Sequence, residues 1–461
     1  MKLNKGFTLV LWLMIAMLLV ASAFAQETTA GLQGSVKDPQ GAVVSKAVVE
    51  VTGPALIGVK KVETDASGYY RFANLPPGTY TITVTAQGFR TLKQTGITLA
   101  TGQLPTIDLK LEIGGVEQTV EVSSAAPLVD VAQSKVQTNI TNDVLDNVPK
   151  GRSFQSVIQF APGARNEPLQ GGYQIDGASN TENAYLVEGQ ETASAFDGHS
   201  AANVPMEFIQ EVQVKTSGFE AEYGGALGGV VNVIQKRGSN AWHGSVFTYY
   251  EGDAMDSTGA GANVWNSGVG SSQVKQLRRN PDVGVNNGAT GSSVCPGVNC
   301  RVDQPTQFYT PKKDHYRYVT PGFEVGGYLI KDRLWTFNSF APEIVQQART
   351  VHFTSGGNPA NTDRTFHYNR NTYYALSRLD YLLTQKVRVY GAWQYQYARA
   401  TGNTWPNADS AYGMVNPAGG TNADSYNGGL GANYPNVIYN VGADVTLTPS
   451  IVATSRFGYF Y

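Results

Sequence analysis

The chain has 461 residues, a formal net charge of -2 at pH 7 and 15% charged residues. This near-neutral balance gives no basis for a nucleic-acid partner. The 51 glycines and 25 tyrosines indicate a mainly β fold with many turns and aromatic surfaces. The length exceeds one ordinary domain and favours two or three.

The first residues are typical of a secretory signal peptide. Lys2 and Lys5 form a basic start, and residues 7–20 are an apolar run. Ala23 and Ala25 then form a small-x-small pattern, which predicts cleavage after Ala25. Residues 1–25 are therefore expected to be removed.

A type IV prepilin leader, cut after Gly6, is the alternative for this segment, although Leu11 stands where such leaders usually carry Glu. The apolar run is shorter than the about 20 residues that a membrane helix needs. No other long apolar stretch follows, which leaves soluble, surface-attached or β-barrel proteins.

Residues 26–112 predict a β-sandwich. In GTYTITVT, Tyr80, Ile82 and Val84 alternate with threonines, as in a half-buried strand. Short strands separated by Gly/Pro turns predict about seven strands. The stretch TDASGYYRFANLPPGTYTITV resembles the carboxypeptidase regulatory-like domain through Asp65, Gly68, Tyr70, Phe72, Leu75, Gly78 and Tyr80. That resemblance implies a transthyretin-like or carbohydrate-binding-like β-sandwich fold without peptidase chemistry.

Residues 113–239 predict a small α+β domain. Thr141 or Asn142 can cap a short helix that stops before Pro149. Ser153 can cap a second helix, whose apolar face holds Phe154, Val157, Ile158 and Phe160. AYLVEGQ and EFIQEVQVKTS are expected strands. Together with VPKGRSFQSVIQFAPGA and EAEYGGALGGVVNVIQKRGSN, they resemble the plug domain of TonB-dependent outer-membrane receptors.

The last of these stretches is expected to end the plug and lead into a barrel. Its glycines, including Gly224, Gly225, Gly228 and Gly229, let the backbone turn and pack closely. The apolar run that follows predicts a buried strand, with residues 236–240 as the turn into the barrel wall. The resemblance assigns the plug-to-barrel motif to Tyr223, Gly224, Gly228, Gly229, Val230 and Asn232.

The segment VEQTVEV is similar to the energy-coupling box of the same receptors. It comprises Val116, Glu117, Gln118, Thr119, Val120, Glu121 and Val122. The resemblance implies that this strand adds to the sheet edge of a TonB-type inner-membrane energy-coupling protein through main-chain hydrogen bonds. An ordinary linker strand remains the alternative.

Residues 240–461 predict part of a transmembrane antiparallel β-barrel. In KVRVYGAWQYQYAR, Val389 and Trp393 share one face, and Arg388 and Gln394 the other. Strands of about ten residues, aromatic ends and the long 253–316 loop favour a membrane wall over a soluble sheet. GGYLIKDRLWTFNSFAPEI resembles a barrel hairpin of Oar-like receptors, with a short periplasmic turn at 331–333.

We expect about eight to ten strands after the plug, and an eight-stranded barrel is filled by its own side chains. A plug would not fit inside it. The expectation is therefore a partial barrel, cut within its strands.

Cys295 and Cys300, in CPGVNC, are expected to form a local disulfide outside the cytoplasm. No catalytic, cofactor or metal-ligating constellation is predicted. GHSAA lacks the final glycine of a nucleophile elbow, and GGALGG leads into a strand rather than a helix. The histidines are scattered and His199 has no apparent ligand set.

The resemblances imply an outer-membrane receptor and transporter, not an enzyme. The N-terminal sandwich would lie in the periplasm, the barrel would contact outer-membrane lipid, and the ligand would be a small molecule, oligosaccharide or peptide. A surface carbohydrate-binding or adhesion protein is the alternative, with Tyr69 and Phe89 as stacking groups. An Oar-like secretion component is another.

Overall fold

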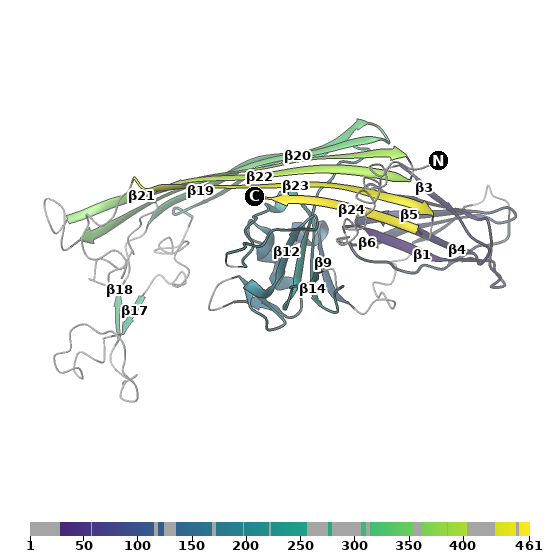
Figure 1. Ribbon diagram of the computed structural model, residues 1–461, viewed down its shortest axis with the longest axis horizontal. Helices are drawn as coiled ribbons and strands as arrows, with labels where there is room; N and C mark the ends of the chain where they lie inside the picture. The colour runs from purple at the N-terminus through teal and green to yellow at the C-terminus, as the bar shows by residue number, and fades with distance from the viewer. Residues whose placement is uncertain are drawn as a thin grey trace, which may run out of the picture.

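The computed structural model describes residues 28–56, 58–114, 119–123, 135–167, 172–196, 198–220, 223–255, 275–278, 306–309, 314–353, 362–384, 386–402, 429–448 and 451–461. Three units follow one another: a sandwich (residues 28–123), a plug (135–235) and a long sheet that we call the wall (243–461). The wall forms one extended layer, with the plug against its middle and the sandwich near one end (Figure 1). Within the described residues, no helix has the length and apolarity to cross a membrane.

The sandwich consists of two sheets. The smaller sheet has the order β4 (Tyr69–Leu75), β1 (Ala30–Lys37), β7 (Leu109–Lys110). The larger has the order β3 (Lys60–Glu63), β2 (Val48–Thr52), β5 (Gly78–Thr85), β6 (Thr91–Leu99), β8 (Thr119–Ser123).

The predicted alternation in the sandwich is confirmed, because Tyr80, Ile82 and Val84 are buried while Thr79 faces solvent. Gly68 turns with φ of +71°, in the left-handed region that favours glycine. The predicted aromatic residues Tyr70 and Phe72 fill the space between the sheets in edge-to-face contact.

The plug has a five-stranded sheet covered by short helical turns. Its strand order is β13 (Gln190–Glu191), β12 (Ala184–Val187), β15 (Val230–Gln235), β14 (Ile209–Ser217), β9 (Val136–Thr141). The shorter elements are α2 (Asn142–Asn147), η1 (Phe154–Phe160), β10 (Ala164–Asn166), β11 (Tyr173–Ile175), η2 (Asn180–Glu182) and η3 (Met206–Phe208). All six residues of β15 are buried, as its run of valines predicts.

Two details of the predicted helices are wrong. The second helix is a 3-10 helix, and Phe160 at its end is exposed rather than on the buried face. Neither Thr141 nor Ser153 caps its helix with its side chain. The Ser153 hydroxyl instead hydrogen-bonds the side chain of Gln155, so a local contact replaces the cap.

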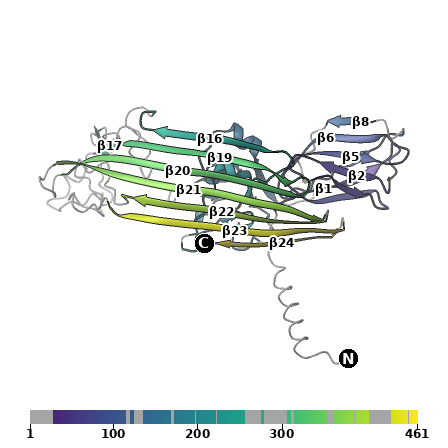
Figure 2. The ribbon, with the colours of Figure 1, turned by 90° about the horizontal axis from the view of Figure 1, so that it is seen from above.

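The wall is a seven-stranded antiparallel sheet. Its order is β16 (His243–Gly252), β19 (His315–Ile330), β20 (Leu334–Phe353), β21 (Thr362–Thr384), β22 (Val387–Thr401), β23 (Gly431–Thr448), β24 (Ile451–Phe460). Figure 2 shows these strands side by side, with the short 331–333 connection at the end nearest the sandwich. A separate pair, β17 (Lys275–Arg278) and β18 (Thr306–Tyr309), lies toward the other end. The sheet is open, since β16 and β24 each pair with one strand among the described residues.

The two faces of the wall differ as predicted. Leu379 and Trp393 on the outward face are 46% and 37% exposed, whereas Arg378 and Gln394 on the plug side are at most 3% exposed. The expected strand length of about ten residues is wrong, because β20 has 20 residues and β21 has 23. A membrane-crossing strand needs only about 9–11 residues.

Past Tyr373, the outward positions of β21 become polar, at Asn371, Asn369 and His367, whereas those opposite them on β20 are mixed, at Ile344, Gln346 and Ala348. The more apolar outward half of β21 is thus the half next to the short connection to β22. The other half extends beyond the length that hydrocarbon requires.

Gly228→Ala should destabilise the plug. An added Cβ would lie 2.3 Å from Asn183 Oδ1 and 2.8 Å from Ala178 Cβ. Asn183 Oδ1 also accepts a hydrogen bond from the Gly229 amide at 2.9 Å, so moving it breaks that bond. We expect a loss of about 1–3 kcal/mol, measured as faster hydrogen exchange of the β15 amides.

Gly391→Ala is the matched control, because an added Cβ there meets nothing within 4 Å. Equal exchange of the β15 amides in both variants would contradict the packing role of Gly228.

Candidate plug–wall latch and its links to the sandwich

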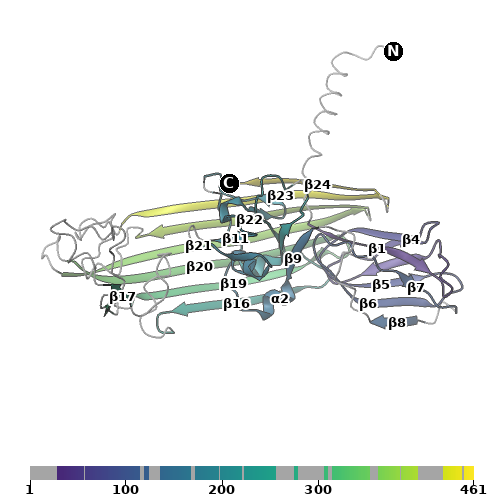
Figure 3. The same cartoon turned by 90° about the horizontal axis from the view of Figure 1, so that it is seen from below.

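The plug lies against the inward face of the wall, in front of its central strands in the view of Figure 3. Plug valines and Phe208 share one apolar cluster with Phe337, Leu376 and Ile438 of the wall. Around this cluster, the contacts between plug and wall are polar. They define the candidate functional site.

Glu188 is the plug residue at the centre of the site. It lies with Gly189 in the two-residue turn between β12 and β13, and both have positive φ, at 51° and 84°. Two consecutive positive φ values define the tight turn that suits a twisted hairpin. The turn is held by Asn232, whose Oδ1 accepts from the Gly189 amide at 3.3 Å.

The Glu188 carboxylate is fully buried and meets two guanidinium groups. Its Oε2 lies 3.0 Å from Arg378 Nη1 and 3.6 Å from Arg237 Nη2, and its Oε1 accepts from the Gln235 amide at 2.8 Å. Burial opposes ionisation, but the two arginines and the Gln235 amide outweigh it and hold the pKa of Glu188 below its ordinary value. The carboxylate is therefore charged at neutral pH.

The wall continues this charge network. Arg378 Nε donates to Asp380 Oδ2 at 2.8 Å, and the Arg378 guanidinium lies 4.4 Å from the centre of the Tyr390 ring. Arg388 and Arg456 both pair with Asp444. Three carboxylates and four guanidinium groups thus form two buried groups of ion pairs, one around Glu188 and one around Asp444. The groups meet at the Tyr390 ring, which both Arg378 and Arg456 contact, and we call them together the latch.

Neutral polar contacts surround the latch. Among the described residues, six such hydrogen bonds join the two units: Gln235 Nε2 to Gln394 Oε1 at 2.6 Å, Asn203 N to Gln396 Oε1 at 3.1 Å, Asn203 Nδ2 to the Tyr374 hydroxyl at 2.9 Å, Gln394 Nε2 to Asn203 O at 3.5 Å, Asn436 Nδ2 to Ala201 O at 3.0 Å, and Asn440 Nδ2 to Val187 O at 3.4 Å. These bonds can be exchanged for water at little net cost, unlike a continuous apolar interface.

The linker from plug to wall is fixed at two points. Lys236 Nζ pairs with Glu324 Oε2 at 2.8 Å. Asn240 Oδ1 accepts from the Asp332 amide at 3.0 Å and from Trp335 Nε1 at 2.8 Å, in and beside the 331–333 turn. The linker is therefore held to the wall from Lys236 onward.

The sandwich reaches the latch through its first described residue. The Thr28 hydroxyl accepts from Arg456 Nη2 at 3.3 Å, and its carbonyl accepts from Arg237 Nη2 at 3.4 Å. All three units consequently meet at the latch.

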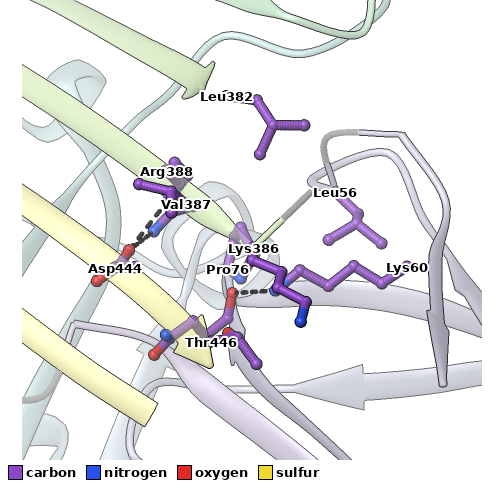
Figure 4. Close-up of a pocket in the computed structure, with 10 residues that line it drawn as sticks. Leu56, Lys60, Pro76, Leu382, Lys386, Val387, Arg388, Asp444 and Thr446 are labelled. Carbon is purple, nitrogen blue, oxygen red and sulfur yellow. Dashed lines mark hydrogen bonds and ion pairs between the residues drawn. The ribbon is translucent and has the colours of Figure 1, made fainter. Parts of the chain in front are cut away.

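A second contact between sandwich and wall surrounds a small cavity (Figure 4). Lys60 is half-buried there and donates to the carbonyls of Ala73 and Asn74 at 2.9 and 3.1 Å. Burial, reinforced by the Arg388 charge, lowers the pKa of Lys60 to about 8.

The residues of the predicted plug-to-barrel motif lie together in the plug. The Tyr223 hydroxyl accepts from Lys215 at 3.2 Å, Gly228 and Gly229 pack against Asn183 and Ile175, and Val230 is buried. Gly224 lines the groove between the plug and β24. Asn232 links the motif to the latch through the Glu188 turn.

The predicted energy-coupling box is described only in part. Thr119, Val120, Glu121 and Val122 belong to β8, which pairs in parallel with β6, whereas Val116, Glu117 and Gln118 lie outside the described residues. The expected cleavage residues Ala23 and Ala25, and the cysteines Cys295 and Cys300, also lie outside them.

The sequence did not single out the latch. Arg388 lies on the polar face of its strand, as the alternation predicts, but Glu188 was not identified as the plug partner of the wall. The sequence signal for Glu188 is its position in AYLVEGQ, where a charged residue directly follows a run of buried strand residues. Within the described residues, no group of three or more His, Cys, Asp or Glu side chains is arranged to hold a metal.

Comparisons with known proteins agree with this arrangement. Residues 31–112 match the carboxypeptidase regulatory-like domain, and residues 128–230 match the TonB-dependent receptor plug domain. The chain is 29% identical to the TonB-dependent transporter Oar of Myxococcus xanthus over 397 residues, which are 80% of this chain and 33% of Oar. It is 30% identical to the ferrienterobactin receptor of Escherichia coli (strain K12) over 159 residues, 29% of this chain and 21% of that receptor.

Among solved structures, the outer-membrane transporter YddB from Escherichia coli aligns with 70% of this chain and 38% of its own, at 15% identity and a TM-score of 0.44. The chain therefore carries a carboxypeptidase regulatory-like domain followed by a TonB-dependent receptor plug domain, and it is similar to the TonB-dependent transporter Oar over 80% of its length. The chain spans about a third of the length of Oar.

Glu188→Gln should loosen the plug from the wall. The substitution keeps the shape of the side chain but leaves Arg378 and Arg237 with one counter-ion fewer. Removing one member of a buried ion pair costs about 3–5 kcal/mol. Urea unfolding measures the loss of free energy of unfolding. Hydrogen exchange of the β12 and β15 amides then shows whether the loss lies in the plug.

Glu191→Gln, at an exposed position of the same hairpin, is the control and should change little. In the unsubstituted chain, the contribution of Glu188 to stability is complete above its ordinary pKa of 4.5. This contribution is lost as the pH falls through the lowered pKa that Glu188 has in the folded chain. An effect of Glu188→Gln no larger than that of Glu191→Gln would contradict the latch.

Proposed function

We propose that the chain is the receptor and transport part of a TonB-dependent outer-membrane system. In this proposal, it moves a ligand past the plug using energy supplied from the inner membrane. Residues 26–112 form a periplasmic sandwich, residues 113–239 the coupling segment and plug, and residues 240–461 a barrel wall in outer-membrane lipid. The chain is a transporter rather than an enzyme.

The observation that carries the proposal is the latch. A plug with a purely structural role would be expected to be held by an apolar interface alone, since replacing buried ion pairs with apolar residues is often neutral or stabilising. Here its attachment combines an apolar cluster with buried charges and exchangeable amide contacts. Such an attachment is stable at rest, yet its hydrogen bonds can be taken over by water when the plug shifts.

The sidedness follows from the polarity of the wall. The more apolar outward half of β21 lies next to its short connection to β22, at the end of the wall near the sandwich. Short turns on the periplasmic side and long loops outside are usual for outer-membrane barrels. The sandwich accordingly belongs on the periplasmic side, where an inner-membrane partner can reach it.

The proposed partner is a TonB-type energy-coupling protein that binds the box. β8 is the last strand of the larger sandwich sheet, so its outer edge is not used by another described strand. An exposed edge offers unpaired backbone groups to an incoming strand.

The alternative of a sugar-binding adhesin loses its main support in the sandwich. The Tyr69 hydroxyl donates to Gln33 Oε1 at 2.9 Å, and Phe89 packs against the sandwich core. Both side chains are therefore engaged within the domain. The proposed ligand of the transporter is a small molecule, an oligosaccharide or a peptide.

Proline substitutions within β8 test the coupling role. Successive backbone N–H groups of a strand point to opposite edges, so Val120→Pro and Glu121→Pro each remove one donor, from different edges. One should weaken binding to the purified periplasmic domain of a TonB-type protein at least tenfold, measured by calorimetry. The other should mainly disturb the pairing with β6.

Val120→Ala and Glu121→Ala are the controls and should bind normally, because recognition runs through the main chain. Full binding by both proline variants would refute the assignment of the box.

A further inference from the structure

A turn of the sandwich is inserted into the plug. Residues 100–102 connect the end of β6 toward β7, and Thr101 is completely buried. The turn is rigid: the Gln103 amide donates to Ala100 O at 3.1 Å, the Gly102 amide donates to Thr29 O at 3.0 Å, and Gly102 has φ of +74°. It presents the peptide groups of Thr101 to the plug.

The plug receives this residue in a socket of four side chains on β9 and β14. The Thr101 amide donates to both Glu211 carboxylate oxygens, at 3.1 and 3.2 Å. The Thr101 carbonyl accepts from Gln213 Nε2 at 2.9 Å, Asn139 Nδ2 at 3.0 Å and Gln137 Nε2 at 3.2 Å. The two strands are paired, with Gln213 opposite Asn139.

These bonds indicate a surface built to hold a peptide group from outside the plug. Glu211 and Gln213 are at most 1% exposed, and a buried polar group without partners costs free energy. Neighbouring amides also orient one another, since Gln137 Nε2 donates to Asn139 Oδ1 at 3.0 Å. Removing the turn would leave the carboxylate and three amides to be satisfied by water.

We propose that the 100–103 turn and the four-residue socket form a releasable joint, through which the sandwich acts as a lid on the plug. The hydrogen bonds of the Thr101 peptide groups support this joint without reference to the proposed function. Only its position on the periplasmic side rests on the proposed function. Together with the Thr28 contacts at the latch, it makes undocking of the sandwich a step that precedes displacement of the plug.

Glu211 makes the joint sensitive to pH. Burial raises the pKa of Glu211 to about 7, although the hydrogen bonds from Asn139 and Thr101 act in the opposite direction. The groups that face it from the turn, from β9 and from β14 are neutral, and Lys215, further along β14, is paired with Glu220.

The direction of the pH dependence follows from the difference between the pKa of Glu211 in the docked state and that in the undocked state. The docked state holds the Glu211 proton more tightly than an undocked, solvated Glu with a pKa of 4.5. Docking is therefore strongest below pH 4.5 and weakens as pH rises through about 7.

Hydrogen exchange of the whole chain in detergent, without ligand or partner, tests the joint. Between pH 5.5 and pH 8, and after correction for intrinsic rates, the Thr101 amide should exchange roughly 30-fold faster at the higher pH. Glu211→Gln should abolish this difference, and Glu191→Gln should retain it. Protection of the β15 amides reports whether the plug remains folded.

Equal corrected exchange of Thr101 at the two pH values would overturn the proposal, as would a pH effect that survives in Glu211→Gln. If Glu211→Gln loses β15 protection, Gln137→Ala replaces it. That variant removes one donor to the Thr101 carbonyl, and it should speed exchange by a similar factor at both pH values while keeping the pH effect. Binding of the energy-coupling partner does not enter the measurement, so failure here is distinct from failure of the transport proposal.

Discussion

Ionised side chains on the inward face of the wall need partners, and this requirement shapes the rest of the molecule. Arg378, Asp380, Arg388 and Asp444 are all nearly inaccessible to water. Charges removed from water are tolerated when they are paired and hydrogen-bonded. The plug supplies Glu188 and the linker supplies Arg237, so a wall of this sequence is complete only with its plug in place.

The same requirement connects all three units. Arg237 and Arg456 each also donate one hydrogen bond to Thr28, which brings the start of the sandwich to the latch. The sandwich also offers Thr101 to the plug sheet. A pull on the segment between sandwich and plug would consequently act on two polar joints before it reached the apolar cluster. Polar joints break over short displacements and re-form with water, which suits the plug movement that the transport proposal requires.

Much of the fold follows from the sequence, because period and turn chemistry are local. The alternation in β5 and β22 predicted which side chains face inward, and the glycines of YGGALGG predicted close backbone packing. Strand length was underestimated, because outward positions past Tyr373 become polar without interrupting the pairing. The latch and the socket could not be predicted, since Glu188 and Arg378 lie 190 positions apart, and Thr101 and Glu211 110 apart. Nothing local in either segment specifies its partner.

The coupling free energy between Glu188 and Arg378 tests this account most directly. A double-mutant cycle with Glu188→Gln, Arg378→Gln and the double variant isolates it, with urea unfolding of the whole chain as the measurement. The account predicts that the double variant is less destabilised than the sum of the single variants by at least about 1.5 kcal/mol. Additive effects, within about 0.5 kcal/mol, would contradict the claim that a buried ion pair holds the plug to the wall.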